Sequence, residues 1–204
     1  MNYFDCIKKN WRFLGFGIVL NFFSSTGQTF YISIFGGEFR RDFDLSDGDF
    51  GFIYMIATLL SAVSLIWLGR LIDFIDLRYY TLLICLGSIT AGFLTSIADS
   101  TVMLVIAFYL LRLMGQGLMN HAAVTSMGKY FTAQRGRAIG IITLGNTLGL
   151  AVYPLVGVIL IKFYGWSYSW LITAVIYSIF LIPLVLWLLK DQTIRHHNYL
   201  FERN

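Results

Sequence analysis

The sequence predicts an all-α membrane protein with six transmembrane helices. Hydrophobic residues make up 57% of the 204 residues and charged residues only 13%, and the mean hydropathy is +0.71. Soluble domains carry about 25% charged residues, so this composition indicates a lipid environment. Six apolar stretches are each long enough to cross a bilayer core of about 30 Å as a helix. They cover residues 11–35, 50–72, 79–98, 101–125, 138–161 and 166–189.

The basic residues between these stretches predict which side of the membrane each loop faces. With a cytoplasmic amino terminus, the outer segments hold three basic residues, Arg40, Arg41 and Lys162. The inner segments hold eleven, which are Lys8, Lys9, Arg12, Arg70, Arg78, Lys129, Arg135, Arg137, Lys190, Arg195 and Arg203. This excess predicts that both termini are cytoplasmic. We expect an integral protein of a bacterial inner (plasma) membrane, with a six-helix bundle over residues 1–189 and a cytoplasmic tail or central loop over residues 190–204.

The composition also bears on other classes of function. The basic residues are scattered over short loops rather than gathered on one face, so no nucleic-acid partner is expected. Cys6 and Cys85 have neither disulfide nor metal-ligand spacing, so no metal and no other cofactor is expected. The helix bundle is predicted to be embedded in a lipid bilayer.

The first stretch carries a polar run that lipid would disfavour. The polar side chains that share one face of a helix, with Tyr31 at its margin, are Asn21, Ser24, Ser25 and Gln28. This stripe predicts the lining of a polar cavity. The alternative is hydrogen bonding between helices, which is worth about 0.6 to 2 kcal/mol per contact.

The second stretch begins after Ser46-Asp47-Gly48-Asp49, small polar residues that can cap the free amides of a helix start. It ends at a charged loop that runs from Gly69 to Arg78. Gly69 permits the close approach of another helix. Asp73 can meet an arginine or the positive amino end of a helix. The third stretch, residues 79–98, follows this loop directly.

The fourth stretch, residues 101–125, places a charge near the middle of the membrane. An arginine at a helix centre costs roughly 2.5 to 3.5 kcal/mol on insertion, so Arg112 is expected to face a polar interior or a water-filled cavity. Gln116 shares its face on an α-helix, and Gly115 and Gly117 let a neighbour approach closely. Arg112 is thus predicted either to bind a substrate or to tie helices together through carbonyls and amides.

A histidine follows this arginine in the same stretch. His121 lies nine residues after Arg112, which is half a turn round an α-helix. The spacing therefore predicts that the two side chains face different ways. It favours a structural histidine, bonded to a neighbouring helix, over a proton carrier.

The fifth stretch contains features of close helix packing. Gly145 and Gly149 form a small-xxx-small pair, and Pro154 invites a bend. Asn146 places a polar group on one side of this helix. The sixth stretch, residues 166–189, is predicted from its length and apolarity.

Three motifs resemble those of the major facilitator superfamily of transporters. The run from Gly69 to Arg78 is similar to its cytoplasmic signature loop, with Gly69, Leu71 and Asp73 at matching positions. The run Arg112-Leu113-Met114-Gly115-Gln116-Gly117 resembles its fourth-helix motif. Residues 130–140 resemble the loop that enters the fifth helix in the branch of monocarboxylate porters and oxalate–formate exchangers.

This resemblance implies one half of a major facilitator fold. Its six helices would form two inverted three-helix repeats and pair with a second six-helix half that is missing from this chain. It also implies a secondary active transporter rather than an enzyme, which moves a small-molecule substrate by alternating access. The cytoplasmic loops would form a conformational latch made of Gly69, Asp73, Arg78 and Arg135.

The charge distribution predicts the class of substrate. All eleven acidic residues lie at helix ends or in loops, whereas Arg112 is a cation inside the membrane. An organic anion such as a monocarboxylate is therefore expected. The residues predicted to bind it are Arg112, Gln28, Asn21, Tyr31, Gln116 and Asn146.

Two other classes of protein stay open at this point. A six-helix intramembrane enzyme would need an activated nucleophile, although the sequence has no Gly-x-Ser-Gly run. A membrane scaffold that transports nothing is the second alternative. Solute uptake separates a scaffold from a transporter.

Overall fold

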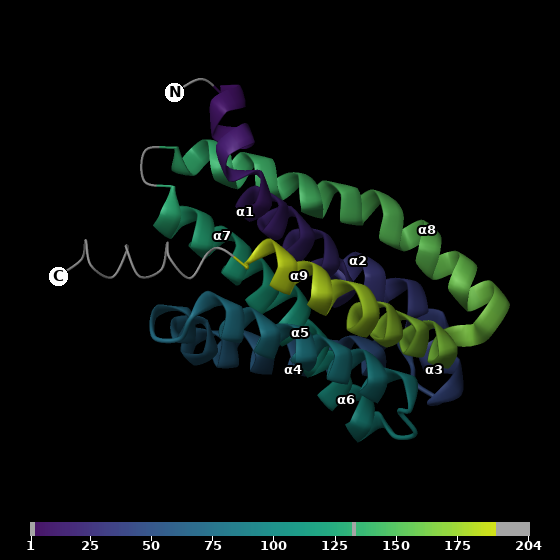
Figure 1. Ribbon diagram of the computed structural model, residues 1–204. Coiled ribbons are helices and arrows are strands. Elements are labelled where there is room, and N and C mark those ends of the chain that lie inside the picture. Colours follow the sequence, from purple (N-terminus) through teal and green to yellow (C-terminus); the bar gives the residue numbers. More distant parts are fainter. Residues whose placement is uncertain (1–2, 132–133, 191–204) are drawn as a thin grey trace.

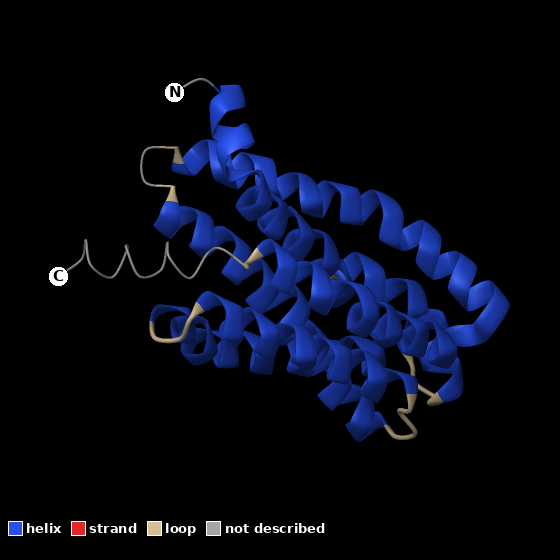
Figure 2. Cartoon of the chain, viewed as in Figure 1, coloured by secondary structure: helices blue, strands red, loops and turns tan. Residues whose placement is uncertain are grey.

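The computed structural model describes the backbone of residues 3–131 and 134–190, with their side chains except those of residues 3–7 and 9. Over these ranges the chain forms helices and no strand (Figures 1 and 2). The elements are α1 (Tyr3–Phe23), η1 (Ser24–Gly27), α2 (Thr29–Ile32), η2 (Ser33–Phe35), α3 (Gly36–Asp42), α4 (Asp47–Leu68), η3 (Gly69–Asp73), α5 (Leu77–Ser96), α6 (Thr101–Leu110), η4 (Leu111–Met119), α7 (Asn120–Tyr130), α8 (Arg135–Ile176), η5 (Tyr177–Leu181) and α9 (Ile182–Leu188). The predicted tail from residue 191, and the side chains of Cys6 and Lys9, lie outside the described residues.

Four helical segments of the described chain are long and apolar enough to cross a membrane: Asp47–Asp73, Leu77–Ser96, Thr101–Tyr130 and Arg135–Leu188. The last has 54 residues, and as one straight helix it would reach about 80 Å, more than twice the bilayer core. It is not straight, because Gly165 interrupts it with φ 73° and ψ 174°. Figure 1 shows the chain turning back at the far end of α8 and returning through α9. The predicted fifth and sixth stretches are the two arms of this segment.

The first predicted stretch is not among these four segments. α1 ends at Phe23, a 3₁₀ turn follows, and Gln28 is extended with φ −80° and ψ 150°. Hydroxyl groups compete with the helix here, since Ser24 Oγ donates to the Asn21 carbonyl at 2.7 Å and Thr26 Oγ1 donates to the Phe23 carbonyl at 3.3 Å. The prediction of one continuous helix with a polar face is therefore wrong, because the polar run is where the helix breaks.

The start of α4 agrees with the prediction from the sequence. Ser46 Oγ accepts a hydrogen bond from the amide of Asp49 at 3.1 Å. In return, Asp49 Oδ2 accepts one from the amide of Ser46, also at 3.1 Å. This capping box satisfies two backbone donors at the helix start and confirms the predicted boundary.

The helices bury part of their apolar surface and expose the rest. α1 and α5 both pack along α8, and rings such as Tyr31, Phe35 and Trp170 fill an aromatic cluster. Other large apolar side chains point outward, including Leu59 of α4 and Leu155 of α8, which are 58% and 68% exposed. Such residues gain about 1.5 to 3 kcal/mol each when they leave water. The outward faces of α4 and α8 therefore suit contact with lipid.

Candidate functional site

Two interruptions of regular α-helix, η1 and η4, lie in contact with each other. η1 is a 3₁₀ turn, and η4 is a π-helix that carries Gly115 and Gly117. A Cβ on Gly27 would lie 2.2 Å from the carbonyl oxygen of Leu111 and 2.6 Å from the amide nitrogen of Gln116. A Cβ on Gly115 would lie 2.9 Å from Gly27 Cα. The two backbones are thus in direct contact, which only glycine at positions 27 and 115 allows.

Arg112 lies beside this contact and uses the broken helix as a partner. Because Gln28 is extended, the carbonyl of Gly27 is free to accept a hydrogen bond from outside its own helix. Arg112 Nη1 donates to that carbonyl at 3.3 Å and to Thr29 Oγ1 at 3.2 Å. Its guanidinium carbon lies 5.2 Å from the centre of the Tyr54 ring. In the part of the chain that the structure describes, no carboxylate pairs with Arg112, and its buried Nε has no hydrogen-bond partner.

Arg112 and Gln116 line a polar pocket between α4 and the η4–α7 segment. The pocket has a volume of about 280 Å³. Its other lining residues are Thr58, Ser61, Ala62, Leu65, Gly117, Asn120 and His121. Four buried side-chain atoms on these residues have no hydrogen-bond partner in the described structure: Thr58 Oγ1, Arg112 Nε, Gln116 Oε1 and His121 Nδ1. Buried polar groups are normally bonded, so these four indicate a site that takes a polar ligand or water.

The position of His121 corrects the prediction from the sequence. The two side chains were expected to face different ways, yet Arg112 and His121 line the same pocket. The reason is the π-helix between them, whose i→i+5 hydrogen bonds place more residues in each turn than an α-helix does. The same change of winding places Met119 and Ala123, which share the arginine's face on an α-helix, in the apolar core instead.

The other predicted binding residues lie elsewhere. Asn21 Nδ2 donates to the carbonyl of Ile142 at 2.9 Å, and Asn146 Oδ1 accepts from Ser24 Oγ at 3.2 Å. Both amides therefore join α1 and η1 to α8. Tyr31 is buried in the aromatic cluster, and Gln28 is half-buried at the start of α2. Of the six predicted residues, the structure brings Arg112 and Gln116 together in the pocket. The pocket also contains four polar residues that were not among the six: Thr58, Ser61, Asn120 and His121. The i, i+3 spacing of Thr58 and Ser61 places both hydroxyl groups on one face of α4, and this pattern is present in the sequence.

The predicted packing glycines of α8 face α1 and η1. A Cβ on Gly145 would lie 2.2 Å from the carbonyl oxygen of Ile18, and one on Gly149 would lie 2.0 Å from Ser25 Oγ. The helix backbones are therefore close at both positions. Helix α8 continues through Pro154, and its non-helical residue is Gly165.

The predicted latch residues lie at the end where α4, α7 and α8 meet their loops. Asp73 forms an ion pair with Lys129 of α7, whose Nζ also donates to the carbonyl of Ile72 at 3.2 Å. Arg135 Nε donates to the carbonyl of Gly128 at 3.0 Å instead. The partner of Asp73 is thus a lysine that the motif comparison did not include.

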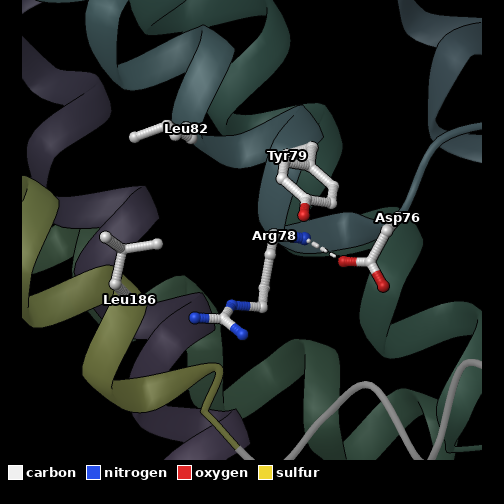
Figure 3. Close-up of a pocket in the computed structure, with 5 residues that line it drawn as sticks. All are labelled: Asp76, Arg78, Tyr79, Leu82 and Leu186. Atoms are coloured by element: carbon white, nitrogen blue, oxygen red, sulfur yellow. Dashed lines mark hydrogen bonds between the residues drawn. The ribbon is translucent and has the colours of Figure 1, made fainter.

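Arg78 lies in the first turn of α5 and has a different environment from Asp73. Its backbone amide donates to Asp76 Oδ1 at 2.8 Å. Figure 3 shows its guanidinium extending from α5 toward α9, where Leu186 lies, into a pocket of about 290 Å³ that Tyr79 and Leu82 also line. Arg78 therefore faces the α5–α9 groove and not Asp73.

The described residues contain no group of three or more His, Cys, Asp or Glu side chains that could hold a metal ion. The polar pocket beside Arg112 can bind by hydrogen bonds and charge. Its guanidinium can pair with an anion, and its hydroxyl, amide and imidazole groups can contact further polar atoms of a ligand.

A sequence model described as Major Facilitator Superfamily matches residues 16–203. An 81-residue segment is 36% identical to Monocarboxylate transporter 9 of Rattus norvegicus and of Mus musculus, and 35% identical to that of Pongo abelii. This segment covers 39% of the chain and 16% of each relative. No solved structure matches the chain. The relatives are mammalian and give no support to the predicted bacterial membrane.

Proposed function

This chain belongs to the Major Facilitator Superfamily, a family of transporters in the membrane, and from that premise we propose that it moves a small organic anion by alternating access. The substrate class that fits best is a monocarboxylate. The chain would supply one six-helix half of the transporter, and a second six-helix half would close the site from the other side. The mammalian relatives are named monocarboxylate transporters, which supports the same substrate class, although the matching segment is a small part of their length.

The observation that supports this proposal most strongly is that Arg112 lies in its pocket without a carboxylate partner among the described residues. A cation in a membrane interior normally pairs with an opposite charge or with backbone carbonyls, and the described residues offer Arg112 one carbonyl, one hydroxyl and one aromatic ring, but no carboxylate. A carboxylate can take two parallel hydrogen bonds from a guanidinium, which are stronger than bonds between neutral groups. The unpartnered atoms of Thr58 and Gln116 could bond the remaining polar atoms of the same ligand.

Uptake into vesicles that contain this chain together with its second six-helix half tests this function. We expect labelled small monocarboxylates to be taken up, while sugars and cationic amines are not, because Arg112 repels cations and offers an anion a partner. Asp73→Asn removes the ion pair with Lys129 and is expected to lower the rate of uptake at equal protein level. Asp99→Asn, at an exposed carboxylate outside the latch, is the control and should leave uptake unchanged. Uptake of neutral solutes but of no organic anion would contradict the proposed substrate class.

We also propose how the chain crosses the membrane. The first crossing would run from α1 to η2, and the others would follow α4, α5, the α6–η4–α7 segment and the two arms on either side of Gly165. The first helix of each three-helix group carries an interruption, η1 in one and η4 in the other, which supports two inverted repeats. Both termini would then be cytoplasmic, as the excess of basic residues in the inner loops indicates.

Cysteine labelling tests this orientation. In a protein that lacks Cys6 and Cys85, Asp47→Cys should react with an impermeant thiol reagent in intact cells. Gly136→Cys should react only after permeabilisation. Both positions are exposed, and a side chain at Gly136 would meet nothing within 4 Å, so neither change disturbs packing. The reverse pattern of labelling would show that the termini face outward.

A further inference from the structure

The polar pocket has a second end, which is formed by His121. At the first end, Arg112 contacts Thr29 and lies against Tyr54, near the start of α4. At the second end, the His121 ring lies 3.5 Å from the position that a Cβ on Gly69 would take, just beyond the end of α4. The pocket therefore follows α4 from the arginine to the histidine, with Gln116 and Asn120 on the opposite wall.

The imidazole of His121 is half satisfied. Its Nε2 lies 3.3 Å from Thr125 Oγ1. Its Nδ1 is buried and has no hydrogen-bond partner within the described ranges. Glycine at position 69 places no side chain against the ring, and the residues that α4 presents to the pocket are all uncharged: Thr58, Ser61, Ala62 and Leu65. One ring nitrogen is thus available to a ligand.

Two charged residues of opposite sign lie near this histidine. Asp73 from η3 and Lys129 from α7 both act on the imidazole, and they form an ion pair with each other. From η4, the charged residue that lines the pocket is Arg112, at the opposite end. No fixed carboxylate in the pocket lining compensates a charge on His121. A ligand is therefore the natural counter-ion of the imidazolium.

We propose that the protonation state of His121 sets how many negative charges the bound anion carries. This proposal rests on the proposed function of the pocket as an anion site. With a neutral imidazole the pocket holds one cation, Arg112, and a monoanion balances it. A dianion would then leave one carboxylate unpaired in a site of low dielectric, which is unfavourable. With a protonated imidazole the pocket holds two cations, one at each end, and a dicarboxylate pairs with both. Binding of a dianion takes up one proton from solution, which goes to the free ring nitrogen of His121.

Fumarate and crotonate are the ligands that test this proposal. They share one rigid four-carbon skeleton, and a carboxylate in fumarate replaces the methyl group of crotonate. Both keep their full charge between about pH 5.5 and about pH 8, so that His121 is the group in the pocket that titrates over this range. The measurement is equilibrium binding to the protein in lipid nanodiscs. We expect the ratio of the fumarate affinity to the crotonate affinity to rise about tenfold as the pH falls across this range. A tenfold change is the effect expected from one additional contact between opposite charges.

His121→Gln keeps hydrogen-bonding capacity without the proton equilibrium. We expect its affinity ratio to change by less than about twofold over the same range. Ser64→Ala, which removes a hydroxyl of α4 bonded to Tyr109 outside the pocket, is the matched control and should behave as the unmodified protein. A measurement that needs no variant is proton uptake at neutral pH, which should accompany binding of fumarate and not of crotonate.

The possible results separate this inference from the proposed function. A pH-independent affinity ratio in the unmodified protein, or a pH dependence that survives in His121→Gln, would overturn the role of His121 and leave the anion site standing. The absence of proton uptake with bound fumarate would do the same. If no organic anion binds at any pH, the proposed function itself fails, and this inference fails with it.

Discussion

Gly27→Ala is expected to cost roughly 3 kcal/mol or more of folding stability, the upper end of the range for overpacked sites. The added methyl group would stand 2.2 Å from the carbonyl oxygen of Leu111 and 2.6 Å from the amide nitrogen of Gln116. Both are backbone atoms of the π-helix, so no side-chain rotation can relieve the clash. Either η1 or η4 must move, and the carbonyl of Gly27 would then lose its position under Arg112. The measurement is the yield of monodisperse protein together with its thermal unfolding temperature.

A matched control separates this contact from the general effect of a methyl group. Gly37 lies in α3 of the same amino-terminal segment, and a Cβ there would meet nothing within 4 Å. Gly37→Ala should therefore leave the yield and the unfolding temperature unchanged or slightly raised, because alanine is the better helix former. Equal unfolding temperatures for Gly27→Ala, Gly37→Ala and the unmodified protein would show that the two backbones are not in contact.

The contact between η1 and η4 also explains where prediction from the sequence succeeded and where it failed. The lengths of the apolar stretches predicted the main helical segments, because spanning a bilayer fixes how many apolar residues a helix needs. Their winding could not be predicted this way. Gly115 and Gly117 indicated close approach of a neighbour, yet their spacing does not distinguish i→i+5 from i→i+4 hydrogen bonding.

That change of winding decided which residues share the pocket. Reading the fourth stretch as one α-helix turned His121 away from Arg112, whereas both line the pocket. The polar stripe of the first stretch had two interpretations, and the bonds of Asn21 and Ser24 to α8 agree with interhelical hydrogen bonding. No member of the stripe lines the pocket beside Arg112. The tertiary contacts of a broken helix depend on its partner, so the sequence of one stretch could not fix them.

The pocket also shows why the second stretch was overlooked. Thr58 and Ser61 are common residues of transmembrane helices, where their hydroxyl groups can bond the carbonyl of the preceding turn. Ser61 Oγ does donate to the carbonyl of Thr58 at 2.8 Å. Of these two hydroxyl groups, the one that indicates a binding site is that of Thr58, because its Oγ1 is buried and has no hydrogen-bond partner in the described structure. The difference between these two hydroxyl groups depends on their burial, which is known only when α4 is packed against η4.

Arg112→Lys should separate a binding arginine from a structural one. Lysine keeps the positive charge but loses the planar fork that can hold a carboxylate through two parallel hydrogen bonds. A hydrogen bond to a charged group is worth about 1.5 to 3 kcal/mol, so we expect the affinity for monocarboxylates to fall roughly 10- to 100-fold. Arg137→Lys makes the same chemical change at an exposed position of α8 and should bind normally. The measurement is binding of a panel of organic anions to the purified protein and both variants, at matched monodispersity.

A purely structural Arg112 predicts a different pattern in the same experiment. Its bonds to the Gly27 carbonyl and to Thr29 Oγ1 join η1 and α2 to η4, so their loss would lower the folding yield and the unfolding temperature. The protein that does fold would then bind every anion of the panel with unchanged affinity. This result would remove Arg112 from the binding site. A large loss of affinity in well-folded Arg112→Lys instead requires a ligand that contacts the guanidinium, since its protein partners in the described chain are a carbonyl, a hydroxyl and the Tyr54 ring.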